Sequence, residues 1–428
     1  MTIRQTQQEF ADLRSDYSRN RAGCGRWAAA DGVTQSGWSR VRRRSVARLC
    51  VALALVLMVL LTRSAEATDH KYIVYIGTYT GSGSKGIYAY RFDASTGKVD
   101  PIGLAAESDK PSFLAVHPNG RFLYAVNEIG QFDGEKSGSV SAFSIDRNTG
   151  KLTPLNRVSS RGAGTAHLSL DRTGRYVLVA NYSGGSVAVF PIQEDGRLGK
   201  PSSFVQHAGS SVNPERQTGP HAHEIVVTND NRFVLVPDLG LDEVLIYRFD
   251  AAKGLLTPND PAFAKTDPGA GPRHVALHPS GRFVYVVNEL QSTVSVFSYD
   301  ARAGTLRAIA KLTTLPKDFS GRNSTAEILT DLQGRFLYLS NRGHDSVAVF
   351  AINPQNGTLS QVQDVPTGGK TPRNFAIDPT GRWLFAANQE SNNITLFRVD
   401  GHSGRLTRTD TVLPTDKPVC VTFVADKR

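Results

Sequence analysis

Cysteine is scarce in this chain of 428 residues, and its placement is informative. Of the three cysteines, Cys24 and Cys50 lie within the first 67 residues, which leaves Cys420 alone in the remainder. If that N-terminal segment is removed, no intramolecular disulfide can form, so the fold must be stable without one. The zinc-binding patterns CxxC and HExxH are absent as well. We therefore expect no metal site and no cofactor.

A strong excess of basic charge is missing from most of the chain. The formal net charge is +10, but residues 1–67 hold 11 of the 49 Lys and Arg and only 5 of the 39 Asp and Glu. The remaining 38 basic and 34 acidic residues leave a net charge of only +4. A nucleic-acid-binding face would need a larger and clustered excess of Lys and Arg. Nucleic acid is therefore not an expected partner.

The most extended apolar run is Leu49–Leu61, which is too short to span a bilayer comfortably. The small-x-small pattern Ala65-Glu66-Ala67 follows it, as at a signal-peptide cleavage site. Five basic residues precede the apolar run: Arg40, Arg42, Arg43, Arg44 and Arg48. Residues 40–67 are thus predicted to be an export signal, with an uncleaved membrane anchor as the alternative. We expect residues 1–39 to be a disordered prefix, and residues 68–428 to be one domain that is periplasmic or secreted.

The chain is rich in copies of one unit, which is clearest at residues 268–300. HVALH and RFVYVVN contain many β-branched and aromatic residues, and the turn Pro279-Ser280-Gly281 separates them. TVSVFSYD follows as a third strand with alternating buried and exposed positions. A unit of three strands cannot bury both of its faces, so it requires neighbours of the same kind.

An arginine at the end of the turn recurs through the chain and measures the repeat. It stands at Arg121, Arg175, Arg232, Arg282, Arg335 and Arg382. A period of about 50 residues with several strands in each unit is typical of a β-propeller. KYIVYIGT, from Lys71, matches a second strand, and KPVCVTFVAD, from Lys417, matches a first strand. We predict an all-β, seven-bladed propeller whose ring is closed by strands of both termini sharing one blade.

In such a repeat the first strand starts, and the second strand ends, on the same face beside the central channel. Nine residues before the arginine stand Ser112, Ala166, His223, Arg273, Ala326 and Arg373, with Val419 in the shared blade. Seven residues after it stand Glu128, Tyr182, Leu239, Glu289, Arg342 and Gln389, with Thr78 in the shared blade. Opposite charges that converge beside apolar walls favour an anion-binding site. The alternative is that the strand ends are solvent-exposed and that these charged side chains form ion pairs with each other.

The other histidines fall outside these two columns. His117 and His278 stand beside proline in turns, and we interpret them as turn residues. His167, His221 and His274 lie one or two places off the columns, where they either support a site or face solvent. We include His274 among the predicted substrate-binding residues.

Several segments resemble a known family: GTYT from Gly77, GPHAHEIVV, GAGPRHVALHP, YVVNEL and LSNR. They are similar to the seven-bladed propeller lactonases of the bacterial 6-phosphogluconolactonase type, whose relatives include carboxy-muconate lactonizing enzymes. The resemblance covers residues 71–425. It implies a catalytic site at His223, Arg273, Glu289 and Arg342, and Arg373 in TPRNF lies on another shared motif.

The leading hypothesis is hydrolysis of a sugar-type lactone by a water that Glu289 or His223 activates as general base. Arg273 would stabilise the oxyanion or hold an anion, and Arg342 and Arg373 would bind a carboxylate or phosphate. We also expect Gln389, Glu128 and His274 to contact the substrate. The alternatives are a muconate-type lactonizing isomerase and a non-catalytic exported ligand-binding propeller. The expected partner is a small lactone or anionic sugar, and we expect a monomer that contacts membrane only through an uncleaved signal.

Overall fold

The computed structural model of the chain describes residues 70–81 and 83–427. Over this range the chain forms 28 β-strands, arranged as seven four-stranded antiparallel sheets. The same residues contain no helix long and apolar enough to cross a membrane. The predicted prefix, residues 1–39, and the predicted export signal, residues 40–67, lie outside the described residues.

Six of the seven sheets are built from four strands that are consecutive in the chain. They comprise β4 (Phe113–Val116), β5 (Phe122–Asn127), β6 (Ser139–Ile145) and β7 (Leu152–Ser159); β8 (Thr165–Leu170), β9 (Tyr176–Asn181), β10 (Ser186–Pro191) and β11 (Ser203–Gln206); β12 (Val226–Val227), β13 (Phe233–Asp238), β14 (Glu243–Asp250) and β15 (Leu255–Lys265); β16 (Pro272–Leu277), β17 (Phe283–Asn288), β18 (Thr293–Asp300) and β19 (Thr305–Thr313); β20 (Ser324–Thr330), β21 (Phe336–Arg342), β22 (Ser346–Ile352) and β23 (Leu359–Pro366); β24 (Pro372–Ile377), β25 (Trp383–Asn388), β26 (Asn393–Val399) and β27 (Leu406–Pro414).

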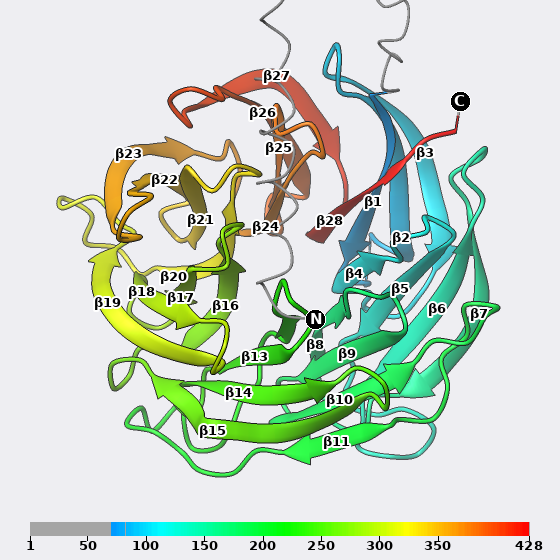
Figure 1. Cartoon of the computed structure of the whole chain (residues 1–428). Helices are drawn as coiled ribbons and strands as arrows, with labels where there is room; N and C mark the ends of the chain where they lie inside the picture. Colours follow the sequence, from blue (N-terminus) through cyan, green and yellow to red (C-terminus); the bar gives the residue numbers. More distant parts are fainter. Residues whose placement is uncertain (1–69, 82, 428) are drawn as a thin grey trace, which may run out of the picture. The chain divides into compact units, whose positions relative to one another are not determined.

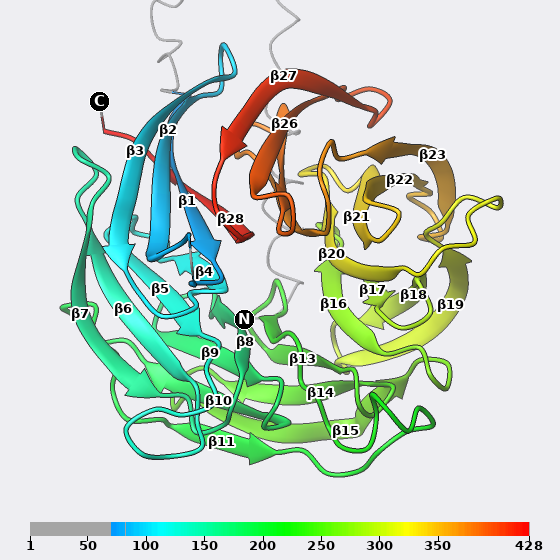
Figure 2. The ribbon, with the colours of Figure 1, turned by 180° about the vertical axis from the view of Figure 1, so that it is seen from behind.

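The seventh sheet joins the two ends of the propeller. Its order is β28 (Pro418–Ala425), β1 (Lys71–Thr78), β2 (Gly86–Asp93) and β3 (Lys98–Glu107). β1 pairs antiparallel with β28, so that Tyr75 lies opposite Thr422. Figures 1 and 2 show the blue β1 and the red β28 side by side from both directions. The predicted seven-bladed propeller, with one blade shared by the termini, is confirmed.

The core is divided among the blade interfaces rather than gathered in one place. Each of the seven buried apolar clusters joins two neighbouring blades. The repeated arginine belongs to this packing, since the Arg232 guanidinium lies over the Phe233 ring, 5.3 Å from its centroid. The ring in turn packs on Gly304 of the next blade, where a Cβ would approach it to 2.3 Å and where φ is +69°. A bulkier residue at Gly304 would therefore separate the two blades.

A β-bulge interrupts the innermost strand of several blades near its start. The register between β16 and β17 shifts between Pro272 and His274, and that between β24 and β25 shifts between Pro372 and Asn374. The bulged residues are thus Arg273 and Arg373. Bulges re-aim side chains and are common beside active sites. Here they break the strict alternation of a strand, and two consecutive residues of the inner strand line the central channel.

Candidate functional site

The first of the two predicted columns converges on one small cavity at the propeller axis. Six of its seven members line this cavity: Ser112, Ala166, His223, Arg273, Arg373 and Val419. The seventh, Ala326, accepts a hydrogen bond from Arg273 Nε through its carbonyl oxygen at 3.2 Å. Each residue comes from a different blade, because every inner strand starts at the same height in the ring.

Glu289, which follows β17, is the centre of an arginine cluster. Its carboxylate accepts hydrogen bonds from Arg273 Nη1 and from Arg216 Nη2, the latter at 2.9 Å. Arg342 Nη2 lies 3.0 Å from the same carboxylate. The Glu289 side chain is only 7% exposed. Three guanidinium groups therefore occupy both oxygens of one buried carboxylate.

The arginines decide the protonation state of this carboxylate. Burial by itself would raise the pKa of Glu289, but the charges of Arg342 and Arg273 and the hydrogen bond from Arg216 outweigh it and hold the pKa well below its usual range. Burial and the like charge of Arg273 lower the pKa of the Arg342 guanidinium to about 9. The carboxylate of Glu289 is therefore ionised within the cluster.

His223 stands beside this cluster on the channel wall. Its side chain is buried, and its Nδ1 has no hydrogen-bond partner among the described residues. The ring lies edge to face with those of Tyr182 and His274, at centroid distances of 5.4 and 5.1 Å. Burial, reinforced by the charge of Arg273, lowers the pKa of His223 well below its usual value. The imidazole is therefore neutral at pH 7.

Arg373 lies over an aromatic ring on the other side of the site. Its guanidinium carbon is 5.2 Å from the centroid of the Tyr79 ring. The Tyr79 hydroxyl donates to Glu128 Oε2 at 2.7 Å. The predicted residues Arg373 and Glu128 are thus linked through Tyr79, and the structure gathers them with the other arginines.

Two predicted substrate-binding residues have other partners. His274 Nδ1 lies 2.9 Å from Glu327 Oε1, although the residue also lines the small cavity with His223. Gln389 donates to its neighbour Glu390 at 2.7 Å and lines a separate cavity of about 310 Å³ with Tyr79. Gln389 therefore does not line the small cavity with His223.

Three residues of the cluster were not among the predicted site residues, although Tyr182 stands in the second column. Arg216 lies in the connection between β11 and β12, where the repeat offers no register. Tyr182 accepts a hydrogen bond from Arg216 Nη2 at 3.1 Å and stacks on His221 at 4.6 Å. Tyr79 directly follows β1. The signal for Arg216 was the interval of 57 residues between Arg175 and Arg232, the longest in the chain, which indicates an insertion there.

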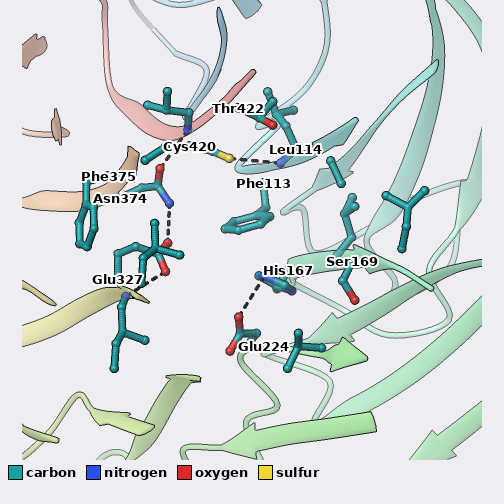
Figure 3. Close-up of a pocket in the computed structure, with 18 of the residues that line it drawn as sticks. Phe113, Leu114, His167, Ser169, Glu224, Glu327, Asn374, Phe375, Cys420 and Thr422 are labelled. Atoms are coloured by element: carbon teal, nitrogen blue, oxygen red, sulfur yellow. Dashed lines mark hydrogen bonds and ion pairs between the residues drawn. The ribbon is translucent and has the colours of Figure 1, made fainter. Parts of the chain in front are cut away.

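Directly below the site lies a second ring, one residue further along each inner strand. Its members are Phe113, His167, Glu224, His274, Glu327, Asn374 and Cys420. Side chains of this ring bind across to neighbouring blades: Asn374 donates to Glu327 and accepts from the Val421 amide, and Cys420 Sγ accepts from the Leu114 amide (Figure 3). His167 Nε2 lies 3.5 Å from Glu224 Oε1. This second ring separates the small cavity from a larger one of about 470 Å³.

Within the described part of the chain, no three His, Cys, Asp or Glu side chains come together in a way that could hold a metal ion.

The described residues thus form a seven-bladed propeller with a cationic, histidine-containing site at its axis. The family described as "Lactonase, 7-bladed beta-propeller" matches residues 73–423, and the chain belongs to it. At the level of this family the chain is a lactonase. The resemblance inferred from GPHAHEIVV and PRHVALHP is thus confirmed.

Similar proteins cover nearly the whole propeller. The 6-phosphogluconolactonase of Bacillus subtilis (strain 168) is 40% identical over 83% of this chain and 99% of its own length. The 6-phosphogluconolactonase of Formosa agariphila is 35% identical over 72% of this chain and 86% of its own. Among solved structures, the periplasmic gluconolactonase PpgL of Pseudomonas aeruginosa has a TM-score of 0.78 and 36% identity, covering 83% of this chain and 99% of that one.

Proposed function

We propose that this lactonase hydrolyses a sugar lactone at the site formed by His223 and the arginine cluster, and that the cluster holds an anionic part of the substrate or of the transition state. One observation carries the proposal: four arginines surround the site, against three carboxylates, Glu289, Glu128 and Glu327. Positive charge in a partly buried site is costly unless an anion shares it. An oxyanion, a carboxylate or a phosphate would supply that negative charge.

We assign the role of general base to His223 rather than Glu289. Both oxygens of Glu289 are already engaged by guanidinium groups, so neither is free to accept a hydrogen bond from the attacking water. His223 is neutral and has a ring nitrogen without a protein partner. Glu289 then serves to hold Arg273, Arg342 and Arg216 in position.

The reaction follows in two steps. The imidazole of His223 accepts a proton from a water molecule as the water oxygen bonds to the lactone carbonyl carbon and the carbonyl electrons move to oxygen. The tetrahedral intermediate then collapses, the bond from the carbonyl carbon to the ring oxygen breaks, and the proton passes from His223 to that oxygen. The product is the open hydroxy acid. Arg273 and Arg373, whose charges act on His223, would stabilise the oxyanion.

The relatives include a protein named 6-phosphogluconolactonase and a protein named gluconolactonase. The predicted export signal favours an unphosphorylated substrate, because phosphorylated sugars are scarce outside the cytoplasm. Planar guanidinium groups bind a carboxylate and a phosphate equally well in geometry, so the arginine cluster suits either lactone. Fractionation of the native host into periplasm and cytoplasm tests the export on which this preference rests.

The decisive experiment is a pH-stat assay of the purified protein with gluconolactone and with its 6-phosphate, corrected for spontaneous hydrolysis. We expect enzyme-dependent acid release, and the ratio of kcat/KM for the two lactones identifies the substrate. Acid release at the uncatalysed rate with both would overturn the proposal. A muconate-type diacid assayed in parallel, with product analysis, tests the isomerase alternative.

A further inference from the structure

Two buried polar atoms on the wall of the small cavity have no partner in the described structure. They are Ser112 Oγ and His223 Nδ1. Each belongs to a side chain of a residue that is only 4% exposed, and both residues line the same cavity. A buried hydroxyl or imidazole nitrogen without a hydrogen bond costs about 1–3 kcal/mol, so such groups in folded proteins normally share a partner.

The size of the cavity identifies the partner that would satisfy both atoms. Its volume is about 10 Å³, and a cavity of about 10–15 Å³ on this measure holds one water molecule. The walls are polar enough to retain water, since Arg273 and Arg373 also line the cavity. A sugar ring is far too large for this space.

We propose that one water molecule bridges Ser112 Oγ and His223 Nδ1, and that Ser112 is a positioning residue for His223. The bridging water accepts a hydrogen bond from Nδ1–H and donates one to Ser112 Oγ. A neutral imidazole carries one proton, so placing it on Nδ1 leaves the lone pair on Nε2. Nε2 is then the atom that accepts the proton of the attacking water. This part of the inference rests on the proposed role of His223 as general base.

The groups around His223 explain why a neutral partner is needed at Nδ1. The charges of Arg273, Arg373 and Arg342 act on the imidazole from three blades, and the rings of His274 and Tyr182 pack against it. Three positive neighbours oppose the imidazolium that forms during the reaction. A hydrogen bond from Nδ1–H to water offsets part of that repulsion without adding a carboxylate that would pair with the arginines.

The direct test is a crystal structure of the full chain at a resolution that shows ordered water. We expect a density peak within hydrogen-bond distance of both Ser112 Oγ and His223 Nδ1, and its loss in Ser112→Ala. Absence of the peak in the unmodified protein would overturn the proposal. This readout does not depend on catalysis, so it stands apart from any failure of the proposed function.

The kinetic test compares Ser112→Ala with Ser169→Ala. Ser169 Oγ is also buried without a partner but lines the larger cavity, so its loss is the same chemical change at a distance from His223. We expect kcat to fall about three- to tenfold in Ser112→Ala alone, the effect of one hydrogen bond. The acidic limb of its pH profile should shift to lower pH, because the imidazolium loses support. Unchanged kcat and pH profile in a folded Ser112→Ala, with thermal unfolding as the check of folding, would overturn the positioning role.

Discussion

Two consecutive rings of side chains line the channel of this propeller, and they differ in how completely their polar groups are paired. The upper ring is the first predicted column, which lines the small cavity, and the lower ring is the second ring described above. The upper ring contains His223, Arg273 and Ser112, and two of its buried polar atoms lack a protein partner. In the lower ring, side chains of Asn374 and Cys420 accept backbone amides of the next blade. Both rings are built by the same repeat, one residue apart.

The pairing of buried polar groups distinguishes the candidate site from a structural element more clearly than the number of charged groups does. The lower ring is also rich in ionisable groups, yet Glu327 is bonded to His274 and Asn374, and Glu224 accepts the Val275 amide. Such contacts fasten neighbouring blades together at the axis. The upper ring keeps excess positive charge and free hydrogen-bonding capacity, which is what a ligand requires.

The largest contrast is expected between two histidines, His223 of the upper ring and His167 of the lower. We expect His223→Ala to lower kcat by about 10²- to 10⁴-fold, the contribution of a general base, with little change in the free energy of unfolding. His167→Ala should instead destabilise the fold by about 1–3 kcal/mol, because Glu224 Oε1 loses its contact with His167, with kcat reduced less than tenfold. Initial rates and urea unfolding of both variants measure this. Near-normal turnover in His223→Ala would remove the functional distinction between the rings.

Glu289→Gln comes next, because it breaks a buried charge cluster. Leaving Arg273 and Arg342 without their carboxylate should cost about 3–5 kcal/mol of stability and impair turnover by displacing the arginines. The pKa of Glu289 is depressed in the folded state, so its stabilising effect is complete above the unfolded value of about 4.3 and is lost as pH falls toward the folded value. Denaturation curves should therefore show that the difference in free energy of unfolding between the unmodified protein and Glu289→Gln becomes smaller below about pH 4. A gap independent of pH would mean that Glu289 is not ionised in the cluster.

Arg216→Ala should have a smaller effect, on substrate binding. The Arg216 side chain is 41% exposed, so its ion pair with Glu289 contributes little to stability. If Arg216 contacts an anionic substrate, KM should rise about tenfold while kcat changes little, which corresponds to about 1.4 kcal/mol. Arg232→Ala, whose guanidinium lies over Phe233 away from the site, is the matched control. An unchanged KM would assign Arg216 to the support of Glu289 only.

Glu224→Gln should have the smallest effect. Burial and the charge of Glu327 raise the pKa of Glu224 well above its usual value, so the side chain is a neutral acid that glutamine can replace. We expect unchanged kcat and a stability change below about 1 kcal/mol near neutral pH. Because the folded pKa is raised, the stability that Glu224 contributes is complete below about pH 4.3 and declines as pH rises. The free energy of unfolding, measured at pH 4.5 and 7.5, should therefore rise in Glu224→Gln relative to the unmodified protein as pH increases. A variant less stable than the unmodified protein at pH 7.5 would contradict this assignment.

The propeller was predictable because the sequence features that specify it are local and recur in every blade. Arg232, Phe233 and the glycine turn of the next blade recur in register, so one recognised unit fixes the others. The shared blade followed from the two incomplete units at Lys71 and Lys417. The fourth strands could not be delimited from the sequence, and β15 and β3 have 11 and 10 residues. Nothing in their polar outer sequences marked where pairing would end.

The site was predictable only where it follows the repeat. His223, Arg273, Glu289, Arg342 and Arg373 stand at fixed distances from the turn arginine, and the ring symmetry brings them to one axis. Arg216 lies on a connection without register, so no count of residues could place it beside Glu289. His274 was placed with the substrate, but its contact with Glu327 depends on the bulge at Arg273, which turns two successive residues toward the channel.

The sequence by itself determined the architecture, the number of blades and the columns of residues that reach the axis, because strand periodicity and turn chemistry act over a few residues. Only the tertiary structure decided which of those residues remain unpaired. Pairing depends on contacts such as Arg216 with Glu289, 73 residues apart in the chain, and His274 with Glu327, 53 residues apart. Those contacts set the charges and hydrogen bonds that surround each group, which is why the roles of His223 and Glu289 could not be separated from the sequence.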